Sequence, residues 1–341
     1  MSIRSWSFAL GVTAACLSAA ALPVQAQTVL TISSWAPVTH GLNKDFLLPW
    51  SQQIEKETEG RVKFRFLPKA VSNPPGSFDA VRDGLADISY ISHSHLANRF
   101  PLVKFLNLPL LSDSATARSV AAWRVYTKHF GQFDEHKGVK LLTIHAHGPG
   151  MVFTARKPVT QASDIVGQKI RVSGGISLEM AEALGASPVV KPPTEAFELL
   201  SGGVVDGIFF PAESVTAFKL TGALKYMTTV PGGLYADTHA VFMNPKKFDS
   251  LSKEDQATID KYAGEAMARM AGQAWDKADQ AAMHDLKSAG IEETRADAAF
   301  LDEVRTRTAA LRDAWIATAN ARGVSGEKIL EEFAREAGGA Q

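Results

Sequence analysis

The sequence predicts an α/β fold with two lobes and one long helix that spans both of them. Three observations lead to this prediction. Strand and helix patterns alternate along the chain, one helix–strand motif occurs twice, and a long helical pattern fills much of the C-terminal third. Alternating strands and helices are typical of βαβ units and a largely parallel sheet. We therefore expect a ligand cleft between two such lobes.

The alternation occurs in two successive groups of elements. In the first group the expected strands are 29–33, 62–67, 88–92 and 140–145, and the expected helices are 42–59, 78–85 and 115–130. In the second group the expected strands are 151–155, 169–172 and 188–190, and the expected helices are 178–184 and 196–200. Each group is expected to form the sheet of one lobe.

One helix–strand motif occurs twice, at residues 78–92 (FDAVRDGLADISYIS) and 197–211 (FELLSGGVVDGIFFP). Both copies begin with Phe and an acidic residue, and both reach Gly-x-x-Asp just before an apolar strand. Gly84 thus corresponds to Gly203, and each glycine suits the left-handed position that ends a helix. We favour two similar lobes in tandem over a chance match.

A helical pattern without proline runs from Lys253 to about Ala289. At 1.5 Å per residue such a helix is about 55 Å long, which exceeds one small domain. It is therefore expected to lie along both lobes. Two further helices, at 300–321 and 327–337, are expected to complete one lobe.

The first 26 residues have the pattern of a secretory signal peptide. Arg4 supplies a positive start, an apolar stretch ends at Leu22, and small residues form a cleavage site that ends at Ala26. The sequence therefore predicts export to the periplasm and cleavage after Ala26. The single cysteine, Cys16, lies in this segment, so no disulfide is expected in the mature chain.

The remaining chain has the length of two domains, at roughly 100 to 200 residues each. The expected division gives 1–26 to the signal peptide, 27–149 with about 236–270 to the first lobe, and 150–235 with about 271–341 to the second. The 36 basic and 36 acidic residues are balanced and form no long block, which argues against nucleic acid or an anionic membrane as partner. A polar or charged small molecule is the expected ligand.

The stretch GQKIRVSGG, residues 167–175, places an arginine between the two apolar residues of a short strand. The strand stops at a glycine pair. Ligands of open α/β sheets bind beyond the carboxyl ends of the strands. From these residues alone two interpretations of Arg171 stay open: an anchor for an anionic ligand, or an exposed arginine on a solvated edge.

Six stretches follow one another along the mature chain: EGRVKFRFLP, AVRDGLADISY, FTARKPV, DIVGQKIRVSGG, GVVDGIFFP and MNPKKFDSLSKEDQ. Together they resemble the solute-binding proteins of tripartite ATP-independent periplasmic (TRAP) transporters, in the group named for four-carbon dicarboxylate uptake. The resemblance implies a periplasmic-binding-protein-like fold, hinge closure around a carboxylate, and delivery to a membrane permease. It also implies that Arg171, which stands at the family's KIRV arginine, binds the carboxylate.

Two positions depart from the family's pattern. Met151 stands where many members carry a second arginine, and Phe209-Phe210 stand where many carry asparagine. Both changes remove polar groups, and an unpaired buried polar group on a ligand costs about 1 to 3 kcal/mol. We therefore expect a monocarboxylate with an apolar or aromatic body; a dicarboxylate or a sugar acid is the alternative. Since strand residues alternate between faces, at most one of the two phenylalanines is expected to line the cleft.

Other candidate ligand contacts lie near expected strand ends. Trp35 offers a ring for stacking and His40 a hydrogen bond, unless their loop only packs on its own lobe. Asn73 carries a carboxamide, but Asn-Pro-Pro-Gly is also ordinary turn sequence. Glu213 either contacts the ligand or favours the start of a helix. The remaining candidates are Ser92, His93, His147 and Ser173.

Two His-x-His pairs, His93 with His95 and His145 with His147, raise the question of a metal. Zinc usually takes three or four protein ligands, and no spaced carboxylate accompanies either pair. Neither a metal nor a cofactor is therefore expected. No G-x-S-x-G, H-E-x-x-H or P-loop motif occurs, so a hydrolase is only a remote alternative to a receptor. A receptor that passes its signal to a signalling system is a more plausible alternative than a hydrolase.

Overall fold

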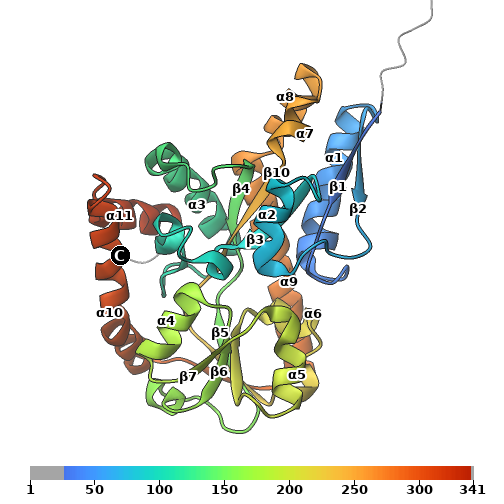
Figure 1. Ribbon diagram of the computed structural model, residues 1–341. Helices are drawn as coiled ribbons and strands as arrows, with labels where there is room; N and C mark the ends of the chain where they lie inside the picture. The colour runs from blue at the N-terminus through green and yellow to red at the C-terminus, as the bar shows by residue number, and fades with distance from the viewer. Residues whose placement is uncertain (1–26, 339–341) are drawn as a thin grey trace, which may run out of the picture.

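The computed structural model describes residues 27–338, which form two α/β lobes stacked one above the other (Figure 1). The predicted signal peptide, residues 1–26, lies outside the described residues. Within 27–338 no helix combines the length and the apolar character that a membrane span requires.

The first lobe contains a five-stranded sheet in the order β2-β1-β3-β10-β4. Its strands are β1 (Thr28–Ile32), β2 (Val62–Phe66), β3 (Ile88–Ser92), β4 (Lys140–Ala146) and β10 (Thr238–Met243). β1 runs parallel to β2 and β3, whereas β10 runs antiparallel to β3 and β4. The expectation of a largely parallel sheet is wrong here, because a strand that returns from the second lobe enters the middle of the sheet.

The second lobe contains a six-stranded sheet in the order β11-β9-β5-β8-β6-β7. Its strands are β5 (Met151–Thr154), β6 (Lys169–Val172), β7 (Ser187–Val190), β8 (Gly207–Phe210), β9 (Tyr226–Thr229) and β11 (Glu292–Arg295). β6 is parallel to β7 and β8, and β5 is antiparallel to β8 and β9. Each sheet is thus mixed, with one strand that crosses over from the other lobe.

Helices cover both sheets and connect them. The first lobe carries the π-helical turn 42–47, α1 (Leu48–Glu57), α2 (Ser77–Arg82), α3 (Ala115–His129), α7 (Pro245–Asp249) and α8 (Lys253–Lys261). The second lobe carries α4 (Gly175–Ala183), α5 (Ala196–Ser201) and α6 (Ala212–Ala217). The last helices are α9 (Gly264–Ser288), α10 (Ala298–Asn320) and α11 (Gly326–Glu336).

The repeated motif builds the same unit in each lobe, α2–β3 in the first and α5–β8 in the second. Gly84 and Gly203 both adopt a left-handed conformation, with φ of 81° and 65°. The aspartate three residues later holds the neighbouring strand in each lobe. Asp87 accepts a hydrogen bond from the Thr31 backbone at 2.7 Å, and Asp206 accepts one from the Lys169 backbone at 2.9 Å. The prediction of two similar tandem lobes is confirmed.

The predicted long helix is broken near its start. α8 ends at Lys261, and Gly264 begins α9 with a φ of 61°, packed against the Trp123 ring. The remaining 25 residues of α9 extend about 38 Å. α9 packs on α3 and β4 of the first lobe and on α6 of the second (Figure 1). A helix that spans both lobes is therefore confirmed, but it is shorter than predicted.

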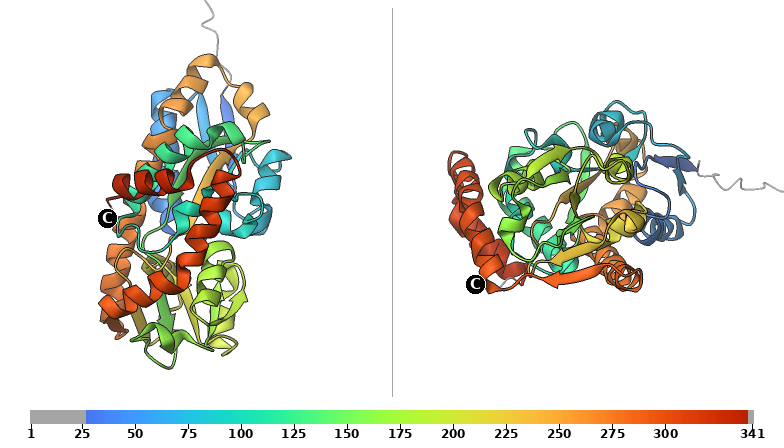
Figure 2. Two further views of the ribbon diagram at one scale, coloured as in Figure 1. Left: turned by 90° about the vertical axis from the view of Figure 1, so that its left-hand side faces the viewer. Right: turned by 90° about the horizontal axis from the view of Figure 1, so that it is seen from below.

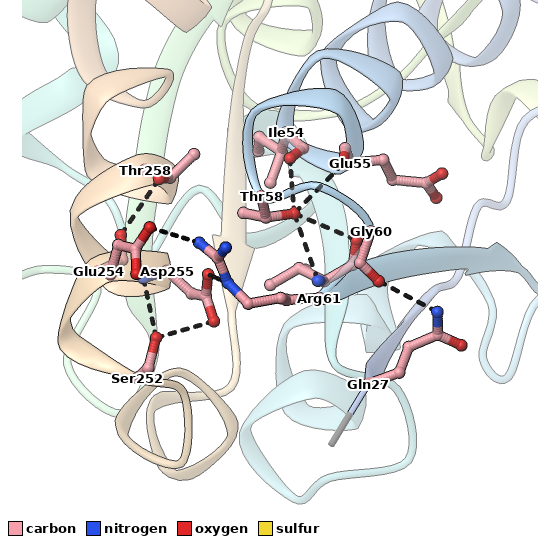
Figure 3. A network of polar contacts seen from close by, with 11 residues as sticks. Gln27, Ile54, Glu55, Thr58, Gly60, Arg61, Ser252, Glu254, Asp255 and Thr258 are labelled. Atoms are coloured by element: carbon pink, nitrogen blue, oxygen red, sulfur yellow. Dashed lines mark hydrogen bonds and ion pairs between the residues drawn. The ribbon is translucent and has the colours of Figure 1, made fainter. Parts of the chain in front are cut away.

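α8 is joined to the first lobe by an ion-pair network around Arg61, just before β2 (Figure 3). The Arg61 guanidinium donates to Asp255 at 3.0 Å and to Glu254 at 2.7 Å. The side chains of Arg61 and Asp255 are mostly shielded from solvent, whereas Glu254 is exposed. The network thus holds the first turn of α8 beside β2.

The C-terminal helices lie along one side of the molecule and contact both lobes (Figure 2). α10 packs against α4 of the second lobe and the segment 102–107 of the first, whereas α11 packs against α3. The centre of the Phe105 ring lies 4.9 Å from the centre of the Trp315 ring and 5.2 Å from that of the Phe333 ring. Both helices were expected to complete one lobe. The contacts show instead that α10 packs on both lobes and that α11 packs on the first.

Candidate ligand-binding site

A narrow cavity of about 30 Å³ lies between the lobes, at the edge where β3, β6 and β8 end. Ligand pockets commonly lie at such an interface between domains. Its wall combines residues of both lobes and of α9. They are Trp35, His40, Leu42, Ser92, His95, His147, Ser173, Pro193, Phe210, Pro211, Ser214, Phe218, Tyr235, Asp237, His239 and Trp275.

Arg171 lies in β6 and is fully buried, which excludes the alternative of an exposed edge arginine. Its Nε and Nη2 donate to the Lys191 carbonyl at 2.8 and 2.5 Å, and Nη2 also donates to Ser173 Oγ at 3.1 Å. The guanidinium carbon lies 4.7 Å from the centre of the Phe210 ring. Arg171 thus contacts two residues of the cavity wall, although its own side chain is not part of the wall.

One nitrogen of this guanidinium stays without a partner. Nη1 of Arg171 is buried and makes no hydrogen bond to any of the residues 27–338. Burial lowers the pKa of Arg171 to about 10, so the group is still cationic at neutral pH. A cation with one unused donor beside Ser173 and Phe210 can bind an anionic ligand group.

Asp237 places a carboxyl group in the cavity wall, on the segment that leads into β10. Its oxygens accept hydrogen bonds from Ser94 Oγ at 2.6 Å, from Asn107 Nδ2 at 3.3 Å, and from Ser92 Oγ. Burial raises the pKa of Asp237 to about 6. The three donors come from the protein itself, so this carboxyl group is already satisfied without a ligand.

Buried and half-buried histidines surround the same region. His239 stacks on His145 at a ring distance of 5.2 Å and an angle of 10°, and His95 meets the Trp35 ring edge-on at 5.8 Å. Burial lowers the pKa of His95 and of His145 to about 3, and that of His147 to about 4. These imidazoles are neutral at pH 7. Among residues 27–338 no group of three or more His, Cys, Asp or Glu side chains is arranged to hold a metal ion.

Glu213, at the start of α6, joins the two lobes at one side of the cavity. Its Oε1 accepts a hydrogen bond from the Gly41 backbone at 3.0 Å and lies 3.2 Å from His40 Nδ1. Its backbone nitrogen donates to Asp279 of α9 at 2.8 Å. The carboxylate thus contacts the first lobe, and it does not line the cavity.

A second contact between the lobes lies on the far side of the cavity. Lys104 of the first lobe pairs with Glu179 of α4 at 2.5 Å. Gly174 and Gly175 also approach Ser94 so closely that a Cβ on either glycine would lie about 3 Å from it. The glycine pair that ends the Arg171 strand therefore allows the lobes to meet.

Several predicted site residues lie in the cavity wall, and they come from loops and strand ends of both lobes. They are Trp35, His40, Ser92, His147, Ser173 and Phe210. Phe210 lines the cavity and packs in one apolar cluster of the second lobe, whereas its neighbour Phe209 is not in the wall and packs in a different apolar cluster. This is the alternation that the strand pattern predicts.

Three other predicted residues lie outside the wall. Asn73 caps the turn 74–76 by accepting from the Gly76 backbone at 3.0 Å. His93 turns into the first lobe, where it bonds Thr238 at 2.9 Å and His136 at 3.0 Å. Met151 lies opposite Phe210 in the β5–β8 ladder, within an apolar cluster of the second lobe.

Ten of the sixteen wall residues were not among the predicted site residues, and four of these ten belong to two segments. Tyr235, Asp237 and His239 lie at the entry to β10, a strand that the sequence analysis did not predict. Trp275 lies on α9, where an apolar residue at helical spacing is indistinguishable from an ordinary core position. The signal that was available is the stretch LYADTHAVFM, in which polar residues precede an apolar strand.

Two lobes joined by crossing strands, with a cavity between them that both lobes and a shared helix line, are the architecture of a two-lobed solute-binding protein. Residues 32–318 match the family described as bacterial extracellular solute-binding protein, family 7, or DctP. The chain belongs to this family, the solute-binding proteins of TRAP transporters. This membership defines a periplasmic binding protein and not an enzyme.

Two solved structures of TRAP solute-binding proteins are similar over nearly their full length. One, from Bordetella bronchiseptica, contains bound (R)-mandelate and (S)-mandelate; it is 51% identical with a TM-score of 0.89, over 91% of this chain and 99% of that one. The other, from a marine metagenome and specific for aromatic acid ligands, is 32% identical with a TM-score of 0.85, over 92% of this chain and 99% of that one.

A further relative is known from its sequence. It is described as outer membrane transporter protein TsaT of Comamonas testosteroni. Its sequence is 31% identical over 328 residues, which cover 95% of this chain and 96% of the relative.

Proposed function

We propose that this protein is a periplasmic receptor for aromatic monocarboxylates, which it delivers to a TRAP-type membrane permease. The observation that carries the proposal is the buried guanidinium of Arg171, with Nη1 unpaired among residues 27–338 and the Phe210 ring 4.7 Å away. One cation beside one aromatic wall residue suits a ligand with one carboxylate and one ring.

The carboxylate is expected to bind at Arg171 and Ser173. A guanidinium donates through a planar fork whose geometry matches a carboxylate. Lys191 already occupies Nε and Nη2, so Nη1 is the donor that a ligand oxygen would take. Ser173 Oγ, which accepts from Arg171, has its own hydrogen to donate.

The ring of the ligand is expected to pack among aromatic wall residues. Trp35 comes from the first lobe, Phe210 and Phe218 come from the second, and Trp275 comes from α9. A ligand that touches all of these residues contacts both lobes at once. Such contacts favour the closed arrangement of the lobes and therefore couple binding to hinge closure.

A dicarboxylate or a sugar acid is the second candidate, and the composition of the wall argues against it. Among the described residues that line the cavity there is no lysine or arginine to pair with a second carboxylate. The Bordetella relative with bound mandelate and the metagenome relative that is specific for aromatic acids support the aromatic reading. Recovery of transport with a co-expressed permease would separate a transport receptor from a ligand sensor.

The proposal is tested by thermal unfolding of the mature chain with benzoate, phenylacetate and mandelate, against succinate and galactonate. A ligand at 100 times its dissociation constant stabilises the folded state by about 2.7 kcal/mol, which raises Tm by a few degrees. We expect the aromatic acids to raise Tm. If only succinate or galactonate raised Tm, the assignment of an aromatic ligand would be wrong, but the assignment of a solute receptor would stand.

A further inference from the structure

We infer that the preferred ligand carries a hydroxyl group in addition to its carboxylate, and that His95 and His239 recognise this hydroxyl. The inference rests on the proposed function, because it concerns the same cavity. It adds a second polar requirement to the ligand and assigns that requirement to two histidines.

Both histidines line the cavity with ring nitrogens that lack partners. Nδ1 and Nε2 of His95 and Nδ1 of His239 are buried, and none of them makes a hydrogen bond within residues 27–338. Other polar side chains of the wall, such as His147 and Asp237, are paired with protein groups. A buried polar atom without a partner is unfavourable, so a ligand that supplies the partner gains affinity.

The charge state of His95 selects the kind of partner. Burial lowers its pKa to about 3, with the Arg171 cation adding to the effect, so the imidazole is neutral at pH 7. A neutral imidazole has one N–H donor and one acceptor nitrogen. A carboxylate can only accept and so cannot satisfy the acceptor nitrogen. A hydroxyl both donates and accepts, and it therefore suits either nitrogen.

An ammonium group, the other common donor on small acids, is less suitable. Asp237 is the anionic group of the wall, but Ser92, Ser94 and Asn107 already donate to its carboxyl oxygens. The Arg171 cation is close enough to lower the pKa of His95, and it would also disfavour a second positive charge. A hydroxylated acid is therefore expected to bind more tightly than the corresponding amino acid.

His145 provides a matched control. Both of its ring nitrogens are buried and lack partners within residues 27–338, as in His95, and its ring stacks on His239. It does not line the cavity. A substitution of His145 therefore removes a buried imidazole of the same kind without removing a group that a ligand can reach.

The test measures the affinity of the full mature chain for matched acids by calorimetry: phenylacetate, mandelate and phenylglycine, which differ by H, OH and NH3+, together with benzoate and 3-hydroxybenzoate. We expect at least one hydroxylated acid to bind about tenfold or more tightly than its unhydroxylated partner. Phenylglycine is expected to bind no more tightly than phenylacetate. Equal affinities within both matched pairs would overturn the inference and leave the proposed function intact.

Two variants locate the effect. His95→Phe and His239→Phe are expected to lower the hydroxyl preference about tenfold while phenylacetate or benzoate still binds. His145→Phe is expected to keep the preference of the unsubstituted protein. If both cavity variants still bound hydroxylated acids more tightly than their unhydroxylated partners, residues other than His95 and His239 would recognise the hydroxyl group. If none of the aromatic acids binds, the proposed function itself fails. The affinities of the unsubstituted protein decide the matter even if a variant does not fold.

Discussion

Two buried arginines, Arg118 in the first lobe and Arg171 in the second, show the same side chain in two different roles. They are 1% and 0% exposed, and burial lowers the pKa of each to about 10. Both are therefore cationic at neutral pH, and neither interacts with solvent. What separates them is the set of hydrogen-bond partners.

Arg118 is used by the protein itself. From α3 its two terminal nitrogens donate to four backbone carbonyls, those of Leu106, Leu108, Ser112 and Gly232, at 2.9 to 3.5 Å. These carbonyls belong to a loop of the first lobe and to the segment that crosses between the lobes. The guanidinium thus holds the loop and the crossover together.

Arg171 has only two partners, the Lys191 carbonyl and Ser173 Oγ, and its Nη1 has none among residues 27–338. Neither burial nor pKa distinguishes the two arginines. A buried nitrogen without a partner does: Nη1 of Arg171 is one, and no Arg118 nitrogen is, among residues 27–338. This difference assigns Arg118 to structure and Arg171 to binding.

The largest effect is expected from Arg118→Ala. The change leaves four buried carbonyls without their donor, and each buried polar group left unsatisfied costs about 1 to 3 kcal/mol. Urea unfolding of the ligand-free chain should show the loss. The order of ligand preference should stay that of the unsubstituted protein; a stable variant with lost binding would reverse the two roles.

Arg171→Ala is expected to weaken ligand binding more than it lowers the free energy of unfolding. Truncation of one partner of a buried charge pair costs about 2 to 5 kcal/mol, so the affinity for aromatic acids should fall by about one and a half to three and a half orders of magnitude. The unfolding free energy without ligand should change less than in Arg118→Ala. Titration calorimetry measures the affinity, and unchanged affinity would remove Arg171 from the site.

The two phenylalanines of β8 extend the comparison to apolar residues. Phe210→Ala removes a ring that contacts both the cavity and the Arg171 guanidinium, so affinity for aromatic acids should fall about tenfold. Phe209→Ala is the control, since that side chain is buried in a different apolar cluster and does not line the cavity. It should lower Tm and leave ligand preference unchanged. An equal loss for aromatic and aliphatic acids in Phe210→Ala would argue against ring stacking.

A smaller, pH-dependent effect is expected from Asp237. Burial raises the pKa of its carboxyl group to about 6, so protonation removes a negative charge from the cavity as pH falls through 6. An anionic ligand favours the protonated form. Affinity should therefore rise severalfold between pH 7.5 and pH 5, and Asp237→Asn should abolish the rise. A flat profile in the unsubstituted protein would contradict this role of the charge.

The smallest effect is expected from Glu213→Gln. The amide oxygen can still accept from the Gly41 backbone, but the charge beside His40 is lost. Since the contact joins the lobes without lining the cavity, affinities for all ligands should fall by the same factor, about twofold to fivefold. A change in ligand preference would instead place Glu213 in direct contact with the ligand.

The sequence patterns predicted the elements whose contacts are local. The helices α2 and α5 and the strands that follow them repeat one motif, and both glycines adopt the expected conformation. The break before α9 was not predictable, because it depends on Gly264 packing against Trp123, about 140 residues earlier in the chain. Helical propensity on both sides of Gly264 conceals this break.

The missed part of the site has the same cause. β10 pairs with β3 and β4, which are distant in sequence, so its place in the middle of the first sheet cannot be seen from its own residues. The stretch LYADTHAVFM indicates a strand, but only the sheet places Asp237 and His239 beside the cavity. The prediction that Asn73 contacts the ligand failed because of a local interaction. Its carboxamide oxygen accepts a hydrogen bond from the Gly76 backbone and caps the turn that follows.

A crystal structure of the mature protein with a bound aromatic acid would show whether Arg171 is the unsatisfied cation that receives the ligand's carboxylate. We expect a carboxylate oxygen within hydrogen-bond distance of Arg171 Nη1 and the aromatic ring beside Phe210. A carboxylate bound elsewhere in the cavity, with Nη1 still lacking an acidic partner, would contradict this expectation.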